Sequence, residues 1–385
     1  MADHRPTPAE GEDVDFDLHG LVGVRLVDAA PSDVAAVRRQ LGPVQRPLLR
    51  EPDVVIRFVD RLTTSSTLRY LGPDEAGFTD DAFLVLRSKH KAKSRVQVPM
   101  AQVGGRCELV CERGLPAVPL LIPILNLTVL ANGGLALHAA AFEYGGSGAV
   151  VTGWSKGGKT ESLLAFAAGH GGRYVADEWA YLDGDGETVA GVPEPVRVWD
   201  WHLSELLDHG DHGGLSAGTR ARLGMLRLAT SAHARVPEPA RRYRPVRAGD
   251  RVAHALQRQR HVDLPPEQLF DTGLGSLPAR FDVLFYVEST DRSGTTVEPV
   301  DPAEVAARMV ASLQYERLPF RGYYEMFRCA FPDASNPFVE GAEQRERERL
   351  AHVFGGKVAY RVEHPYPVTL AALRAAMSPV MERGR

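Results

Sequence analysis

Lysine and cysteine are scarce in this sequence. Of its 45 basic residues only six are lysine, and two of these, Lys156 and Lys159, share one glycine-rich segment. The cysteines Cys107, Cys111 and Cys329 are too few for a disulfide framework. Cys107 and Cys111 lie four residues apart in a strand-like run, which puts them on the same face. We interpret them as small buried hydrophobic residues rather than as a metal site.

Other features are also missing, and their absence limits the class of protein. No run of 18 apolar residues occurs, which excludes a membrane span. The first 17 residues are polar and acidic with no apolar signal segment, so we expect a cytoplasmic protein. The hydrophobic fraction of 44% and the charged fraction of 24% exclude disorder as the main state. The net charge of −4 makes nucleic acid an unlikely partner.

The length of 385 residues suggests two or three domains at roughly 100–200 residues each. Residues 1–15 are expected to form a disordered tail and 16–113 a small α+β domain. The remainder, 114–385, is expected to be an α/β domain that begins with a buried helix near Pro119. A Gly-Gly turn at 145–146 and an Asp-Gly turn at 183–186 each predict a hairpin, and the two strands of a hairpin are antiparallel neighbours. We therefore expect a mixed sheet.

An arginine-rich stretch interrupts the second domain at about 219–262. It contains eleven arginines against Glu238 and Asp250 as its only acids, and it has few apolar runs. We expect an exposed or mobile insertion there. Its densest part could contact an acidic peptide or phosphate groups, although a solvated insertion without a ligand explains the composition equally well. The candidate substrate contacts are Arg241, Arg242, Arg244 and Arg247.

The segment 153–160 carries the clearest chemical signal. It reads Gly-Trp-Ser-Lys-Gly-Gly-Lys-Thr, matches G-x-x-x-x-G-K-[ST], and lies between a short apolar strand and an expected helix. Glycines let several backbone N–H groups point at one anion, and the following helix adds its positive end. The candidate nucleotide-binding residues are Gly153, Trp154, Ser155, Lys156, Gly157, Gly158, Lys159, Thr160 and Glu161.

Within this segment, Lys159 is expected to reach the β and γ phosphates, and the Thr160 hydroxyl to ligate Mg²⁺. Asp177 and Glu178 end the next strand-like run, where acids would face the phosphates and the metal. His138 precedes the loop in an apolar strand, and from the pattern alone it is as well explained by a structural role. His364 is interpreted as structural.

These residues together resemble the HPr serine kinase/phosphorylase family, whose fold is related to ATP-dependent phosphoenolpyruvate carboxykinase. The resemblance covers about 134–200 and extends more weakly toward the C-terminus. It implies a P-loop kinase core with Asp177 as the base, His138 close to it, and Thr160, Asp177 and Glu178 as metal ligands. The loop departs from the family by having Lys156 in place of Gly, and Glu178 replaces a second Asp. No counterpart of the family's Arg-Gly-Leu-Gly segment occurs, so the resemblance does not extend to HPr as the substrate or to the reverse reaction.

The function that the sequence predicts is ATP- and Mg²⁺-dependent phosphoryl transfer to a hydroxyl, most readily a serine of a peptide or protein. Asp177, His138 and Lys159 are the candidate catalytic residues. A small-molecule kinase on the same core, a carboxykinase-type transfer and a nucleotide-binding regulatory module without transfer are the alternatives. A homo-oligomer stays open, and no membrane partner is expected.

Overall fold

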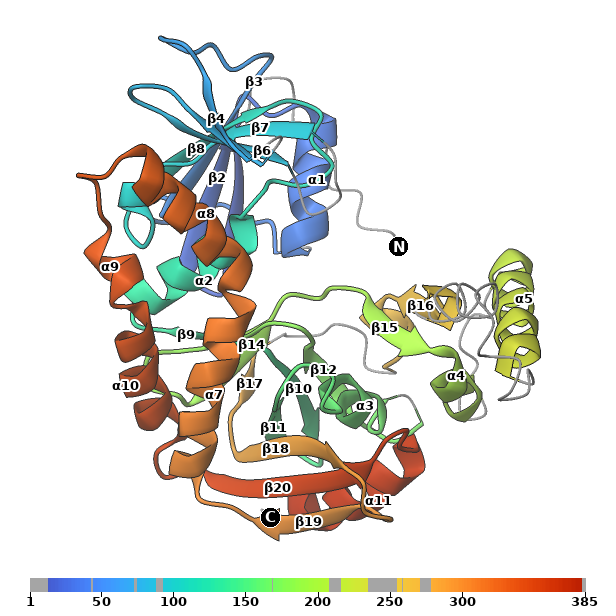
Figure 1. Cartoon of the computed structure of the whole chain (residues 1–385). Coiled ribbons are helices and arrows are strands. Elements are labelled where there is room, and N and C mark those ends of the chain that lie inside the picture. Colours follow the sequence, from blue (N-terminus) through green and yellow to red (C-terminus); the bar gives the residue numbers. More distant parts are fainter. Residues whose placement is uncertain are drawn as a thin grey trace, which may run out of the picture.

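The structure is a computed structural model that describes residues 13–42, 44–72, 75–87, 93–167, 169–207, 216–234, 255–257, 259–270 and 278–382. It is a mixed α/β protein with several β-sheets. Figure 1 shows one sheet at the top of the molecule, a second at the bottom, and a column of helices that joins them along one side. Within the described ranges, no helix is long and apolar enough to cross a membrane.

An eight-stranded mixed sheet forms the upper part, in the order β1-β2-β3-β8-β7-β6-β5-β4. We call it, together with the helices packed on it, the N-terminal lobe. Its strands are β1 (Val14–Leu18), β2 (Val22–Val27), β3 (Val54–Val59), β4 (Arg69–Leu71), β5 (Ala76–Phe78), β6 (Phe83–Arg87), β7 (Lys93–Gln97) and β8 (Cys107–Glu112). The helical segments α1 (Pro31–Leu41), η1 (Met100–Gln102) and α2 (Leu121–Ala131) accompany them.

Buried and more exposed residues alternate along these strands, so one face of the sheet packs into a hydrophobic core. In β8 the buried positions are Cys107, Leu109 and Cys111, which point into one core with residues of α1 and α2. Both cysteines are free thiols on the same face, as the sequence predicted. Burial raises the pKa of the Cys107 thiol to about 12, so it stays protonated and unreactive. The predicted buried helix near Pro119 is confirmed as α2.

A six-stranded sheet, here called the central sheet, has the order β12-β10-β11-β18-β20-β19. Both hairpin and parallel pairs occur in it, which confirms the predicted mixed sheet. Its strands are β10 (Ala139–Tyr144), β11 (Ser147–Thr152), β12 (Arg173–Ala176), β18 (Val283–Thr290), β19 (Thr296–Pro299) and β20 (Val358–Pro365).

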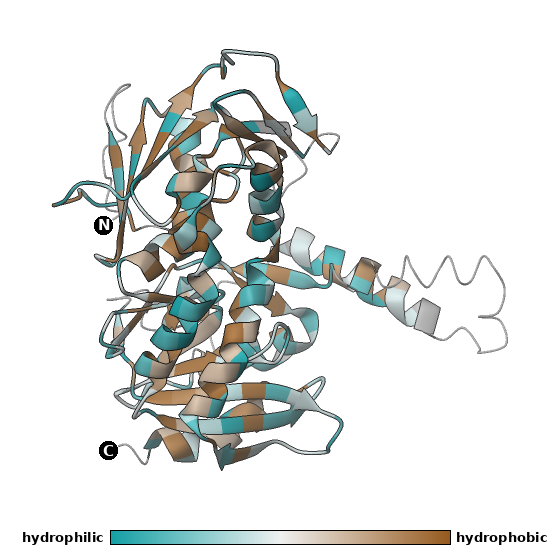
Figure 2. Ribbon diagram, turned by 60° about the vertical axis from the view of Figure 1, so that its left-hand side comes forward, coloured by the Kyte–Doolittle hydropathy of each residue, from teal (hydrophilic) through white to brown (hydrophobic). Residues whose placement is uncertain are grey.

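Helices cover both faces of the central sheet. Because side chains alternate along a strand, Phe142 of β10 faces a core with α3 (Lys159–Leu164) and α11 (Leu370–Met381). The preceding residue, Ala141, faces a second core with α7 (Pro302–Glu316) and α10 (Ala342–Phe354). Figure 2 shows hydrophobic residues along these strands, interspersed with hydrophilic ones.

A smaller four-stranded sheet has the order β17-β14-β13-β9 and lies against the end of the central sheet. Its strands are β9 (Leu135–Leu137), β13 (Ala180–Leu182), β14 (Thr188–Gly191) and β17 (Ala279–Arg280). The predicted turn at 183–186 joins β13 and β14 as an antiparallel hairpin.

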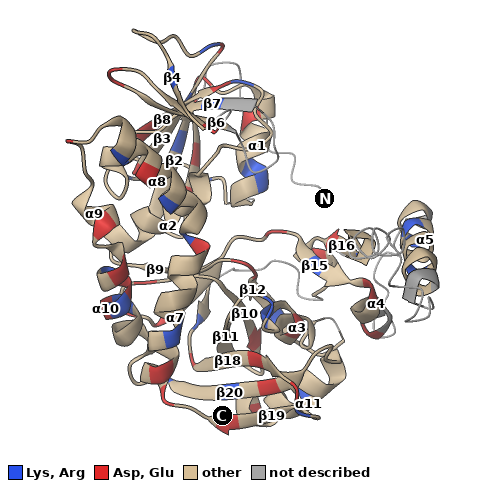
Figure 3. Ribbon diagram, viewed as in Figure 1, with Lys and Arg blue, Asp and Glu red and all other residues tan. Residues whose placement is uncertain are grey.

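The column of helices connects the two parts of the molecule. Arg317 ends α7 and begins α8 (Leu318–Ala330), which leaves the central sheet and packs on β5 and β6 of the N-terminal lobe. The short α9 (Pro337–Glu340) follows, and the chain returns through α10. Figure 3 shows basic and acidic residues interspersed along α8 and α10.

An arm extends from the central part of the molecule (Figure 2). It comprises β15 (Val196–Trp199), α4 (Asp200–Leu207), α5 (Ala217–Ala234), β16 (His261–Leu264) and the 3-10 turn η3 (Pro266–Gln268). Two arginines of the arginine-rich stretch, Arg227 and Arg260, bind the buried carboxylate of Asp200 at 2.9 and 2.5 Å. Part of that stretch therefore neutralises a buried charge. The candidate contacts Arg241, Arg242, Arg244 and Arg247 lie outside the described residues.

Candidate functional site

The glycine-rich segment 153–160 leads from the C-terminal end of β11, an interior strand of the central sheet, into the first turn of α3. Two of its glycines are required by close packing. A Cβ on Gly158, whose φ is 106°, would lie 2.3 Å from His364 Nε2. A Cβ on Gly153 would lie 2.3 Å from the carbonyl oxygen of Val287. The loop thus packs closely against Val287 of β18 and against His364 near the end of β20.

His364 supports this loop from below. It is fully buried at the end of β20, and its Nε2 donates to the carbonyl oxygen of Gly157 over 2.8 Å. The imidazole therefore fixes the peptide that precedes Gly158. This contact is the structural role that the sequence suggested for His364.

The side chain of Lys159 turns back onto its own loop. Its Nζ donates to the carbonyl oxygens of Gly153 at 3.3 Å and of Trp154 at 3.1 Å. Burial lowers the pKa of the amine, although the carboxylates of Glu178 and Glu316 act in the opposite direction. Lys159 is thus a desolvated cation held at the centre of the loop.

Asp177 lies opposite the start of α3. Its two carboxylate oxygens accept from the Thr160 hydroxyl at 3.1 and 3.3 Å. Burial and the nearby charge of Glu178 together raise the pKa of Asp177 to about 7, although the hydrogen bond from Thr160 opposes the shift. A carboxyl group with this pKa can exchange a proton near neutral pH.

A pair of strand breaks brings the remaining residues to the same place. The runs 135–144 and 173–182 each have the composition of a single strand. Instead, each run is divided between the central sheet and the four-stranded sheet, with the break at His138 in one run and at 177–179 in the other. Ala141 pairs with Ala176 on one side of the breaks, and Leu137 pairs with Ala180 on the other. The two breaks therefore face each other.

His138 lies between two carboxylates at this point. Its Nδ1 is 2.7 Å from Glu316 Oε1 and its Nε2 is 3.4 Å from Glu178 Oε2. Burial lowers the pKa of the imidazole, but the hydrogen bonds to Glu178 and Glu316 outweigh it and the net shift is upward. The same hydrogen bonds lower the pKa of both carboxyl groups. The arrangement favours an imidazolium between two carboxylates.

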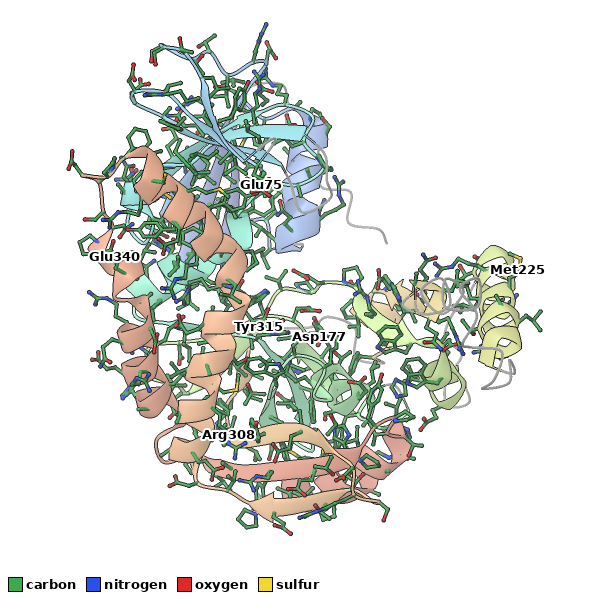
Figure 4. The ribbon with its side chains drawn as sticks, in the orientation of Figure 1. Glu75, Asp177, Met225, Arg308, Tyr315 and Glu340 are labelled. Carbon is green, nitrogen blue, oxygen red and sulfur yellow. The ribbon has the colours of Figure 1, made fainter. Side chains whose placement is uncertain are left out.

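The sequence did not single out Glu316. It ends α7 and lies 178 residues after His138 in the sequence, so no local pattern links the two. The sequence also did not single out two aromatic residues, Tyr315 and Trp179. Tyr315 has its ring 5.0 Å from that of Trp154, and Trp179 has its ring 5.8 Å from His138. Figure 4 labels Tyr315, on α7, and Asp177, just after the end of β12.

The structure thus brings together most of the sequence-predicted site. The loop, its lysine and Thr160 adjoin Asp177, and Glu178 reaches His138. Lys156, with a φ of 65°, is exposed on the outer side of the loop, and Ser155 and Glu161 are partly exposed.

The donor set for a metal ion is small. Among the described residues, no group of three or more His, Cys, Asp or Glu side chains is arranged to hold an ion. Thr160 and Asp177 offer one hydroxyl and one carboxylate at the loop, whereas Glu178 is directed to His138. Mg²⁺ that accompanies a nucleotide needs only one or two carboxylates because phosphate oxygens and water complete its shell. The residues present fit that kind of ion.

No protein-family model matches this sequence, and a search of curated proteins found no match. The function is therefore inferred from the site itself.

Proposed function

We propose that this chain is an ATP-dependent kinase that transfers the γ-phosphoryl group to a hydroxyl, most readily a serine of a peptide or protein. The proposal includes a P-loop core of the HPr kinase type within 114–385 and a cytoplasmic location. One observation carries it. The threonine of a glycine-rich loop donates to the buried carboxylate of Asp177, so a candidate base lies directly beside the expected phosphate site.

Nucleotide binding would use the loop. The backbone N–H groups of 153–160 and the amine of Lys159 would contact the β and γ phosphates. Lys159 would exchange its two loop carbonyl partners for phosphate oxygens. The Thr160 hydroxyl, together with the carboxylate of Glu178 or of Asp177, would hold Mg²⁺, which supplies charge neutralisation at the phosphates when bound.

The transfer itself needs a base for the acceptor. The acceptor oxygen forms a bond to the γ phosphorus while the bond from that phosphorus to the β–γ bridging oxygen breaks and ADP leaves. The hydroxyl proton passes to Asp177. His138 would hold Glu178 beside the acceptor and offset part of its negative charge. Positioning and charge neutralisation supply most of the catalysis in such reactions.

The test is transfer of radiolabelled γ-phosphate to serine peptides and to small alcohols. Asp177→Asn is expected to keep ATP binding and to lose transfer by at least about 10²-fold. Lys159→Ala is expected to weaken both. Asp185→Asn, in the exposed turn between β13 and β14, is the matched control and should change neither.

Each contrary result points to a definite alternative. Wild-type transfer by Asp177→Asn would disprove the base assignment. Transfer to small alcohols but not to peptides would make the protein a small-molecule kinase. Nucleotide binding with no transfer to any acceptor would leave a nucleotide-binding module.

A further inference from the structure

A cavity of ≈ 60 Å³ adjoins the candidate site on the side of Glu316. It lies where α2, β9, α7 and α10 meet. Two of its lining residues, Glu316 and Trp179, also contact or adjoin His138. The cavity and the proposed acceptor site therefore share a wall.

The charged groups that line the cavity already have partners. Glu316 binds His138, and Arg317 forms an ion pair with Glu346, which also accepts from Gln314 over 2.7 Å. The rest of the wall is mainly apolar, with Leu130, Leu135, Ala136 and Leu313 among its members. An occupant therefore finds apolar surface and no free charge to pair with.

The volume limits the size of the occupant. A water-sized group takes about 10–15 Å³ by the same kind of measure, so the cavity admits roughly four to six such groups. That is the size of a valine or leucine side chain. A phenyl ring on its methylene, or an adenine ring system, is too large.

The position also separates the cavity from a nucleobase. In a phosphoryl transfer the attacking and leaving oxygens are roughly in line, so acceptor and adenosine lie on opposite sides of the γ phosphate. Its lining residue Glu316 binds His138, which in turn contacts Glu178 next to Asp177, on the side where the acceptor would approach.

We propose that this cavity receives the acceptor side chain adjacent to the phosphorylated serine, and that it selects a small branched apolar side chain such as that of valine or leucine. This inference rests on the proposed kinase function. It assigns a specificity to the acceptor that neither the loop nor Asp177 provides.

The test uses peptides Gly-Gly-Xaa-Ser-Xaa-Gly-Gly with Xaa as glycine, valine, leucine or phenylalanine. Their affinity is measured by calorimetry with Mg²⁺ and a non-hydrolysable ATP analogue, and their kcat/KM by phosphate transfer. The wild-type protein is expected to prefer the valine or leucine peptide over the glycine peptide by about ten- to a hundredfold. The phenylalanine peptide should not share this gain.

Two variants change the cavity in opposite directions. Ala136→Val fills it and should bring the leucine preference toward one. Leu130→Ala enlarges it and should improve the phenylalanine peptide relative to the leucine peptide. Ala190→Val, on β14 of the same sheet, adds the same methyl groups away from the cavity and should keep the wild-type preference. Affinity for the ATP analogue alone should be unchanged in all three.

Failure of the inference is distinct from failure of the kinase proposal. Equal affinity for the glycine and leucine peptides, or an unchanged preference in both Ala136→Val and Leu130→Ala, would show a mere packing defect and overturn the inference even if phosphate is transferred. A side-chain preference in binding without any transfer would support the cavity's role in peptide selection and contradict the kinase function.

Discussion

The residue that most depends on its surroundings is His138. In the sequence it is one polar residue among apolar neighbours, and it gains a role only through Glu178 and Glu316. Its pKa in the folded state is raised above the usual 6.5. A raised imidazole pKa stabilises the fold at pH values below the unfolded pKa, and this stabilisation is lost as pH rises through the folded pKa.

Glu316→Gln is therefore expected to lower the pKa of His138, because it removes one of the two carboxylates that stabilise the imidazolium. Titration of the His138 ring protons by NMR measures this. The variant should also lose part of the stability that the wild-type protein has near pH 6 relative to pH 8. Glu343→Gln, on the exposed start of α10, is the control. An unchanged His138 titration would show that Glu316 has no positioning role.

At the scale of elements, the glycine-rich segment 153–160 illustrates why a glycine is required. Gly146 in the turn between β10 and β11 and Gly158 in the loop both have positive φ. Only at Gly158 would a Cβ meet another group, His364 Nε2 at 2.3 Å, whereas Gly146 has nothing within 4 Å. An alanine at either position would strain the backbone, but only an alanine at position 158 would also collide with a neighbouring group.

Gly158→Ala is expected to lower the free energy of unfolding by about 1–2 kcal/mol through strain alone, with a further loss from collision with His364. It should also weaken nucleotide binding, because the loop can no longer close over β20. Gly146→Ala should show only the strain and keep nucleotide affinity. Thermal unfolding and nucleotide titration measure both effects, and equal behaviour of the two variants would contradict this account.

Much at this scale was predictable from the sequence. Turn residues and strand-like runs predicted the β10–β11 and β13–β14 hairpins, which the structure contains. The loop and Asp177 were found because their spacing is local. The strand breaks at His138 and 177–179 were missed, since apolar periodicity does not tell which of two sheets a strand joins. Glu316 was missed because its contact with the site is made only by folding.

At the scale of the whole molecule, the division near residue 113 understates how far the lobes interlock. The N-terminal core includes Phe320, Tyr324 and Phe327 of α8. Near α9, the buried Asn336 donates through Nδ2 to the carbonyl oxygens of Met100 at 2.9 Å and Val103 at 2.8 Å. The lobe is thus completed by a segment from late in the chain.

Phe320→Ala is therefore expected to destabilise the protein by about 3–5 kcal/mol, because its fully buried ring belongs to the N-terminal core. Hydrogen exchange should show the loss in the strands of the N-terminal lobe, far away in sequence. Leu318→Ala, an exposed residue on the same helix, should cost little. Destabilisation confined to α7 and the central sheet would contradict the interlocked core.

The interlocked helix also has a consequence for biosynthesis. The last strand of the upper sheet ends at Glu112, but α8, which covers β5 and β6, begins only about two hundred residues later. At about 5–20 residues per second, a ribosome needs roughly 10–40 s to bridge that gap. During this interval the nascent sheet has part of its apolar face uncovered, which makes translation the stage at which this protein is most exposed to aggregation.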